Sequence, residues 1–187
     1  VFRGQSTVDG QWTIDGLDFD RLVHLSASRT VGAGEAARAI TAADALAAMK
    51  LALGRPPNSS IDGAALPVSP YQLIAADVDH DGKVTVGDAL AILRAASGAS
   101  DAMAPAWRFV AETESLWSPG SGSLYTREAV AGGPTSVEAH AGQDKPINWV
   151  GVLIGDVDGS WRPGNAEPAP DQSFDVLSAD YFRALGL

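Results

Sequence analysis

One stretch of this 187-residue chain combines carboxylates at a spacing that could bind a metal ion. The run Asp77-Val-Asp-His-Asp-Gly-Lys-Val-Thr-Val-Gly-Asp88 has Asp at its first, third, fifth and twelfth positions and Gly at its sixth. In a twelve-residue calcium loop the early carboxylates converge on one cation, the Gly makes a sharp turn, and the seventh residue offers its backbone carbonyl. The closing residue is usually Glu, so the shorter Asp is a departure. The spacing predicts a calcium (Ca2+) site rather than a metal-free acidic turn, with the ligands Asp77, Asp79, Asp81, Lys83 and Asp88.

A short helix is predicted after this loop, and an earlier segment repeats it. Asp88–Gly98 has apolar residues at helical spacing and ends at a Gly, and Ile40–Gly54 has the same pattern. In this alignment Asp44 corresponds to Asp88. The chain therefore contains a duplicated unit.

A duplicated calcium-loop-plus-helix unit that closes on Asp resembles the dockerin family, the cohesin-binding modules of extracellular bacterial assemblies. The resemblance extends over Gly34–Gly98, and its second half carries the specific motif. It implies an EF-hand helical pair and a cohesin-like partner.

The first repeat departs from the family at the metal-binding positions. Counting back from Asp44 puts Ala33, Glu35 and Ala37 at the three carboxylate positions, and Arg38 where the Gly belongs. One carboxylate beside a cation makes a poor calcium site, so we expect one calcium in the pair rather than two.

The segments on both sides of this unit predict strands. Gln5–Leu17 has an Asp-Gly turn signal typical of a hairpin, and Gly10–Leu17 resembles the last strands of immunoglobulin-like or carboxypeptidase-regulatory-like sandwiches. A short helix is predicted at Ser178–Gly186. Further strands are predicted at Arg21–Ser28, Trp107–Glu114, Ser123–Arg127, Thr135–Ala141 and Ile147–Gly155, the last buried on both faces.

These elements predict an α+β fold, with β-sandwich-like strands at both ends around a dockerin-like EF-hand helical pair. Residues 1–29 form a β segment, either a partial sandwich or a donor arm. Residues 30–100 form the calcium-binding helical pair, and residues 101–187 form a β-rich region with a short terminal helix.

A second acidic motif, Gly155-Asp-Val-Asp-Gly159, echoes the opening of the calcium loop. Asp156 and Asp158 match its first two carboxylates, but no third follows at the needed spacing, and Glu167 only just reaches the twelfth position. Two interpretations stay open, a tight turn and a second cation site.

The composition favours an extracellular acidic protein. Thirteen Lys and Arg stand against 23 Asp and Glu, for a net charge of −10, which argues against binding to nucleic acid or an anionic membrane. The absence of Cys excludes disulfides, and no apolar run is long enough to span a bilayer. A calcium loop suits the extracellular space, where calcium is abundant.

No motif of catalysis is recognisable, and His24, His80 and His140 lie far apart in sequence. We therefore expect a non-enzymatic extracellular structural module rigidified by calcium, which self-associates through β strands into a surface fibre or belongs to a multidomain adhesin. The alternative is a dockerin-type adaptor that anchors a secreted enzyme or scaffold to a cohesin-like protein. Small residues at the helix starts, Ala42 and Ala43 in one repeat and Val86 and Gly87 in the other, favour packing of the helices against the chain's own strands.

Overall fold

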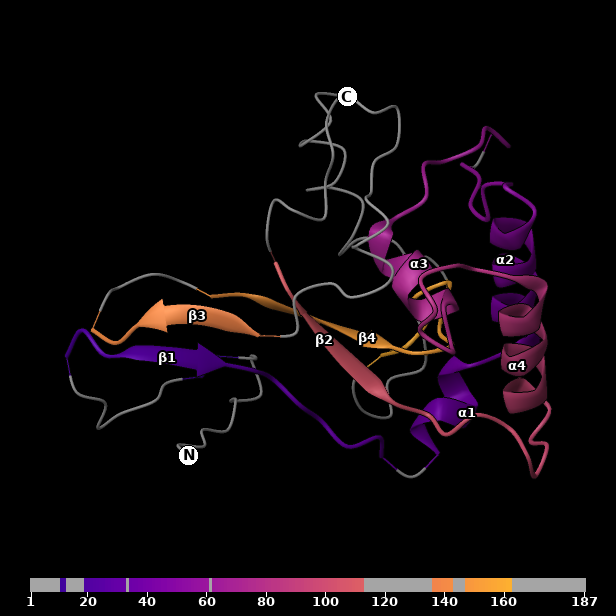
Figure 1. Cartoon of the computed structure of the whole chain (residues 1–187). Coiled ribbons are helices and arrows are strands. Elements are labelled where there is room, and N and C mark those ends of the chain that lie inside the picture. Colours follow the sequence, from indigo (N-terminus) through magenta and orange to yellow (C-terminus); the bar gives the residue numbers. More distant parts are fainter. Residues whose placement is uncertain are drawn as a thin grey trace.

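The structure, a computed structural model, describes residues 11–12, 19–32, 34–60, 62–112, 136–142 and 147–162. Helices and antiparallel strands are mixed in this part of the chain, which confirms the α+β expectation. Figure 1 shows β1 and β3 at one end of the molecule, α2 and α4 at the other, and α3, β2 and β4 between them. In chain order the elements are β1 (Leu22–Leu25), α1 (Glu35–Ala39), α2 (Ala42–Ala52), α3 (Pro70–Ala76), α4 (Val86–Ala96), β2 (Trp107–Ala111), β3 (Val137–His140) and β4 (Trp149–Leu153).

Within the described ranges the strands pair in two separate antiparallel sheets of two strands each. β1 pairs with β3, with Leu22 opposite His140, and β2 pairs with β4, with Trp107 opposite Leu153. The first strand of the described residues, β1, thus pairs with a strand from the C-terminal half of the same chain. Four of the predicted strands are confirmed in part, each over four or five residues within its predicted range. The described ranges contain no β-sandwich, and the strand at 123–127, the helix at 178–186 and nearly all of the hairpin at 5–17 lie outside them.

The prediction that β4 is buried on both faces is correct only for its C-terminal half. Val152 and Leu153 are buried, but Gly151 is exposed, and Trp149 and Val150 are half-buried. A run of apolar residues alone does not distinguish these environments, because it carries no information about which neighbours cover each face.

The duplication in the sequence appears as two matched helices, α2 and α4, of 11 residues each. Both begin with the same capping box, in which a Thr hydroxyl accepts from the backbone and an Asp three residues later accepts from the Thr backbone. Thr41 and Asp44 form this box in α2, and Thr85 and Asp88 form it in α4. The two helices pack side by side (Figure 1), and the capping geometry fixes both Asp side chains at the helix starts.

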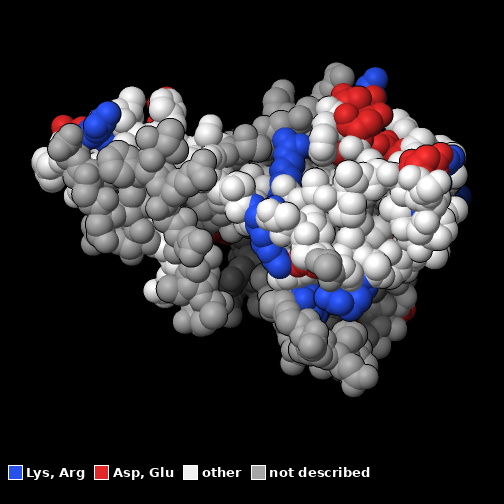
Figure 2. All heavy atoms as spheres, turned by 90° about the horizontal axis from the view of Figure 1, so that it is seen from below, with Lys and Arg blue, Asp and Glu red and all other residues white. Residues whose placement is uncertain are grey.

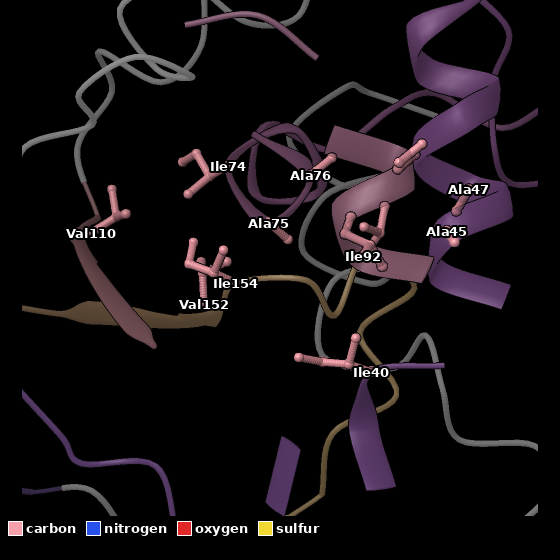
Figure 3. Close-up of a cluster of buried hydrophobic side chains, with 13 residues drawn as sticks. Ile40, Ala45, Ala47, Ile74, Ala75, Ala76, Ile92, Val110, Val152 and Ile154 are labelled. Carbon is pink, nitrogen blue, oxygen red and sulfur yellow. The ribbon is translucent and has the colours of Figure 1, made fainter. Parts of the chain in front are cut away.

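One hydrophobic core joins the helices to the second sheet. Ile74 of α3, Ile92 of α4 and Val110 of β2 are fully buried, and Val152 of β4 and Ile154 pack beside them. Figure 3 shows these side chains converging between the strands and the three longer helices. The chain after β4 is thereby held against the helical part.

The prediction that the starts of α2 and α4 pack against the chain's own strands is wrong for the described residues. Ala42, Ala43, Val86 and Gly87 are all exposed. The buried faces of the two helices carry Ala and Ile residues that contact each other and α3, so the N-terminal residues lie on the opposite, outer side.

Candidate metal centres

The first group of carboxylates lies in the loop that joins α3 to α4. Asp77 is the C-cap of α3, and Thr85 is the N-cap of α4. One carboxylate oxygen from each of Asp77, Asp79 and Asp81 lies within 4.8 Å of the other two. These three residues, which the sequence puts at the first, third and fifth loop positions, could hold a metal ion.

Asp77 is the buried member of this group, with an exposed fraction of 0%. Its Oδ2 accepts a hydrogen bond from the backbone N–H of Gly82 at 3.0 Å, whereas its Oδ1 is buried and has no hydrogen-bond partner among the described residues. Burial raises the pKa of Asp77, the Gly82 N–H opposes this, and the nearby charge of Asp88 adds to the increase. A buried carboxylate oxygen without a partner costs free energy, and a cation would supply that partner.

Asp79 and Asp81 are exposed and shape the rest of the loop. The Oδ1 of Asp79 accepts from the Asp81 N–H at 3.1 Å, and the Oδ1 of Asp81 accepts from the Lys83 N–H at 2.8 Å. Gly82 has a φ of 84°, a conformation that a side chain would disfavour. These bonds use the Oδ1 of each carboxylate, so the Oδ2 of each could bind a cation.

Asp88, predicted as the closing ligand, is not part of the group within 4.8 Å. It is buried, its Oδ1 accepts from the Val78 N–H at 3.0 Å, and its Oδ2 accepts from the N–H and the hydroxyl of Thr85, both at 2.8 Å. Asp88 therefore ties the start of the loop to the start of α4. Lys83 is exposed, and the hydrogen bond described for it is the donation of its N–H to Asp81.

A second group of carboxylates joins two segments that are distant in sequence. Asp44, in the first turn of α2, lies with Asp156 and Asp158, in the turn after β4, so that one oxygen of each is within 4.8 Å of the others. Asp44 is 0% exposed and Asp156 is 8% exposed, while Asp158 is half-buried. The Oδ1 of Asp44 accepts from the Asp158 N–H at 2.9 Å. We call this group the composite cluster.

The turn of the composite cluster repeats the hydrogen bonds of the Asp77 loop. The Trp161 N–H donates to Asp156 Oδ2 at 3.0 Å, as the Gly82 N–H does to Asp77. The Ser160 N–H donates to Asp158 Oδ1 at 2.9 Å, as the Asp81 N–H does to Asp79. Ser160 occupies the position that corresponds to Asp81, the third carboxylate of the Asp77 loop. In the composite cluster the third carboxylate is instead Asp44, from α2.

Burial and mutual repulsion make the composite cluster electrostatically unfavourable without a cation. Burial, together with the charges of Asp44 and Asp158 and against the N–H donors of the turn, raises the pKa of Asp156 to about 7. The pKa of Asp44 is also raised, mainly by burial. The ion pairs between described residues involve other carboxylates, such as Glu35 with Arg29. On the face drawn in Figure 2, Asp and Glu atoms gather mainly at the helical end of the molecule, with a smaller number at the opposite end.

The sequence left a second cation site at Asp156 and Asp158 open, and the structure brings Asp44 to these two residues as a third carboxylate. The loop motif after Asp158 gave no signal for this residue, because Asp44 lies far earlier in the chain. Glu35, the one carboxylate left in the degenerate first loop, lies in α1 and pairs with Arg29 instead of joining either cluster.

Two of the three histidines lie near each other, because His24 and His140 are on the paired strands β1 and β3, two register positions apart, whereas His80 lies in the Asp77 loop. His24 of β1 lies 3.5 Å from Glu138 across the sheet, and His140 of β3 lies 3.2 Å from Asp20, in exposed pairs at the other end of the molecule from the clusters (Figure 1). His80 is exposed in the Asp77 loop with a φ of 60°.

Comparison with protein-family models, with curated proteins and with solved structures finds no match to this chain. None of the helices in the described part of the chain has the length and apolar character needed to cross a lipid bilayer.

Proposed function

We propose that this chain is a non-enzymatic extracellular module whose structure is rigidified by bound calcium. The observation that carries the proposal is the fully buried Asp77, whose Oδ1 lacks a hydrogen-bond partner among the described residues, beside two further carboxylates within 4.8 Å. Calcium takes six to eight oxygen ligands at flexible geometry and suits a loop made of carboxylates, backbone carbonyls and water. The positions of Asp77, Asp79 and Asp81 match those of an EF-hand loop.

The proposal extends to the composite cluster, because it has three carboxylates at the same mutual distance and the same turn hydrogen bonds. A cation there would neutralise two buried carboxylates, Asp44 and Asp156, whose burial is otherwise costly. Ca2+ fits this site as it fits the first, since all three side-chain ligands are hard oxygens.

The two sites would stiffen different parts of the molecule. An ion at Asp77 fixes the angle between α3 and α4. An ion at the composite cluster fastens the turn after β4 to the start of α2, across 112 residues of sequence from Asp44 to Asp156. Structural support of this kind suits a secreted or cell-surface protein, because extracellular calcium would keep both sites filled.

Calorimetric titration of the chelator-treated protein is expected to give two bound calcium ions per chain. Asp77→Asn should remove one and Asp158→Asn the other, since each takes a charge from one cluster. The matched control is Asp62→Asn, which changes an exposed Asp outside both clusters and should leave two. Stoichiometry of zero in the wild type would refute the calcium proposal.

A dockerin-type adaptor is the second candidate function, and the exposed outer faces of α2 and α4 favour it. Leu46 and Leu90, which correspond in the two repeats, are 58% and 52% exposed, and Leu53, Val86 and Leu93 are exposed as well. Large apolar side chains that occur together on a surface indicate a contact with another protein.

Self-association through β strands remains the competing prediction. If this hypothesis is correct, the full-length chain assembles in calcium at high concentration. Deletion of Val1–Val8 should then abolish assembly, because it removes the donor strand. Analytical ultracentrifugation with and without chelator measures this. A full-length chain that stays monomeric at high concentration in calcium would exclude the fibre and leave the adaptor.

A further inference from the structure

Four side chains from four separate segments form a compact cluster beside the composite site. The Arg29 guanidinium lies 4.7 Å from the ring centroid of Trp107 and 4.8 Å from that of Trp161, within the range of cation–π attraction. The two Trp rings meet edge to face at 4.9 Å and 85°. Arg29 also donates to Glu35 Oε1 at 2.5 Å. We call Arg29, Glu35, Trp107 and Trp161 the Arg–Trp clasp.

Glu35 is the centre of the clasp and is itself buried, with an exposed fraction of 6%. Besides the Arg29 contact, its Oε1 accepts from the indole N–H of Trp161 at 2.6 Å, and its Oε2 accepts from the Gly32 N–H at 2.6 Å. Both oxygens are therefore occupied, and its charge is balanced by Arg29. Glu35 is the one carboxylate at the metal-binding positions of the first repeat, and it binds the Trp161 indole and the Arg29 guanidinium instead of a cation.

Trp161 connects the clasp to the metal-binding carboxylates. Its side chain belongs to the clasp, while its backbone N–H donates to Asp156 Oδ2 at 3.0 Å. The adjacent Ser160 donates its N–H to both Asp156 and Asp158 at 2.9 Å, and its hydroxyl to the Ala39 carbonyl at 3.1 Å. Anchoring the Trp161 ring in the clasp therefore restrains the backbone whose N–H groups orient two of the three carboxylates.

We propose that the Arg–Trp clasp positions the turn at 156–161 for calcium binding at the composite cluster, an inference that rests on the proposed function of that cluster. The clasp holds the turn against α1 and β2 before the ion arrives. Without the clasp, the turn would become ordered only when calcium binds. The free-energy cost of that ordering would weaken the observed binding. Groups that orient metal ligands typically change affinity by 10–100-fold when removed. The clasp residues are positioning residues, and none of them is a ligand.

The test measures the two calcium affinities separately in clasp variants of the full chain. Asp77→Asn isolates the composite site, and Asp158→Asn isolates the Asp77 site. Trp161→Ala is expected to weaken calcium at the composite site by at least about tenfold and to leave the Asp77 site within about twofold of its original affinity. Trp161→Phe keeps an aromatic ring beside Arg29 and Trp107 but loses the indole N–H that donates to Glu35, and should restore only part of the affinity. Trp12→Ala, which removes a partly exposed Trp outside the clasp, is the matched control.

A merely structural role would weaken both sites together through loss of folded protein, so selective loss at the composite site is the decisive readout. If Trp161→Ala does not fold, Arg29→Met replaces it, because it keeps an apolar stem and removes the guanidinium that contacts Glu35 and both Trp rings, and it should weaken the same site selectively. Unchanged composite affinity in these variants would overturn the inference while leaving the proposed function intact. A wild-type chain that binds calcium at Asp77 alone would overturn the inference and the second site together, and a chain that binds none would refute the proposed function itself.

Discussion

Calcium is expected to raise the free energy of unfolding by about 4 kcal/mol when its free concentration is a thousand times the dissociation constant of the Asp77 site. The physical reason is the arrangement of carboxylates in that loop. Asp77 is fully buried with one unpartnered oxygen, and it lies beside Asp79 and Asp81 and close to the charge of Asp88. Without an ion these groups repel each other, and with one they become ligands. Urea unfolding in calcium and in chelator measures the difference.

Single substitutions locate the origin of that stabilisation. Asp77→Asn removes the buried charge and should abolish the part of the calcium effect that comes from this loop, whereas Asp62→Asn, at an exposed position outside both clusters, should preserve it. Equal stability of the wild type in calcium and in chelator would show that neither cluster binds the ion in the folded state.

In chelator the protein is expected to lose a few kcal/mol of stability as the pH rises from about 4 to about 7. Burial raises the pKa of Asp156 from its ordinary value of 3.8 to about 7. Between these values the folded chain holds a proton that the unfolded chain has released. Because the folded state binds more protons, its stability is fully present below the unfolded pKa and is lost as the pH approaches the folded pKa. The raised pKa values of Asp44 and Asp77 act in the same direction.

Calcium should reverse this dependence, because the ion binds only deprotonated carboxylates. Unfolding curves at pH 5 and pH 7.5, each with calcium and with chelator, test both signs. Asp156→Asn removes the titrating group and should flatten much of the fall seen in chelator, while Asp62→Asn should not. A metal-free wild type that becomes more stable from pH 5 to pH 7.5 would contradict the electrostatic account of the composite cluster.

Local sequence was sufficient for the features that depend on neighbouring residues. The first carboxylate cluster was predictable because Asp77, Asp79 and Asp81 lie within five residues, so the chain can bring them together in one turn. The matched helices were predictable for the same reason, since a Thr cap, an Asp three residues later and an Ala-rich stretch act within a single turn or helix. The strands at 22–25 and 107–111 also followed from local patterns, although their partners did not.

Only the tertiary structure decided which distant segments meet. Asp44 lies 112 residues before Asp156, and no periodicity or spacing links them; the contact arises because the shared core of α2, α3, α4, β2 and β4 places the turn after β4 against the start of α2. The repeat aligned Glu35 with a metal-binding position of a calcium loop, but in the folded chain Glu35 lies in α1 and binds Arg29 and Trp161. Sequence specifies each carboxylate and its local hydrogen bonds, but the free energy that gathers them comes from burying apolar surface elsewhere, and that depends on the whole fold.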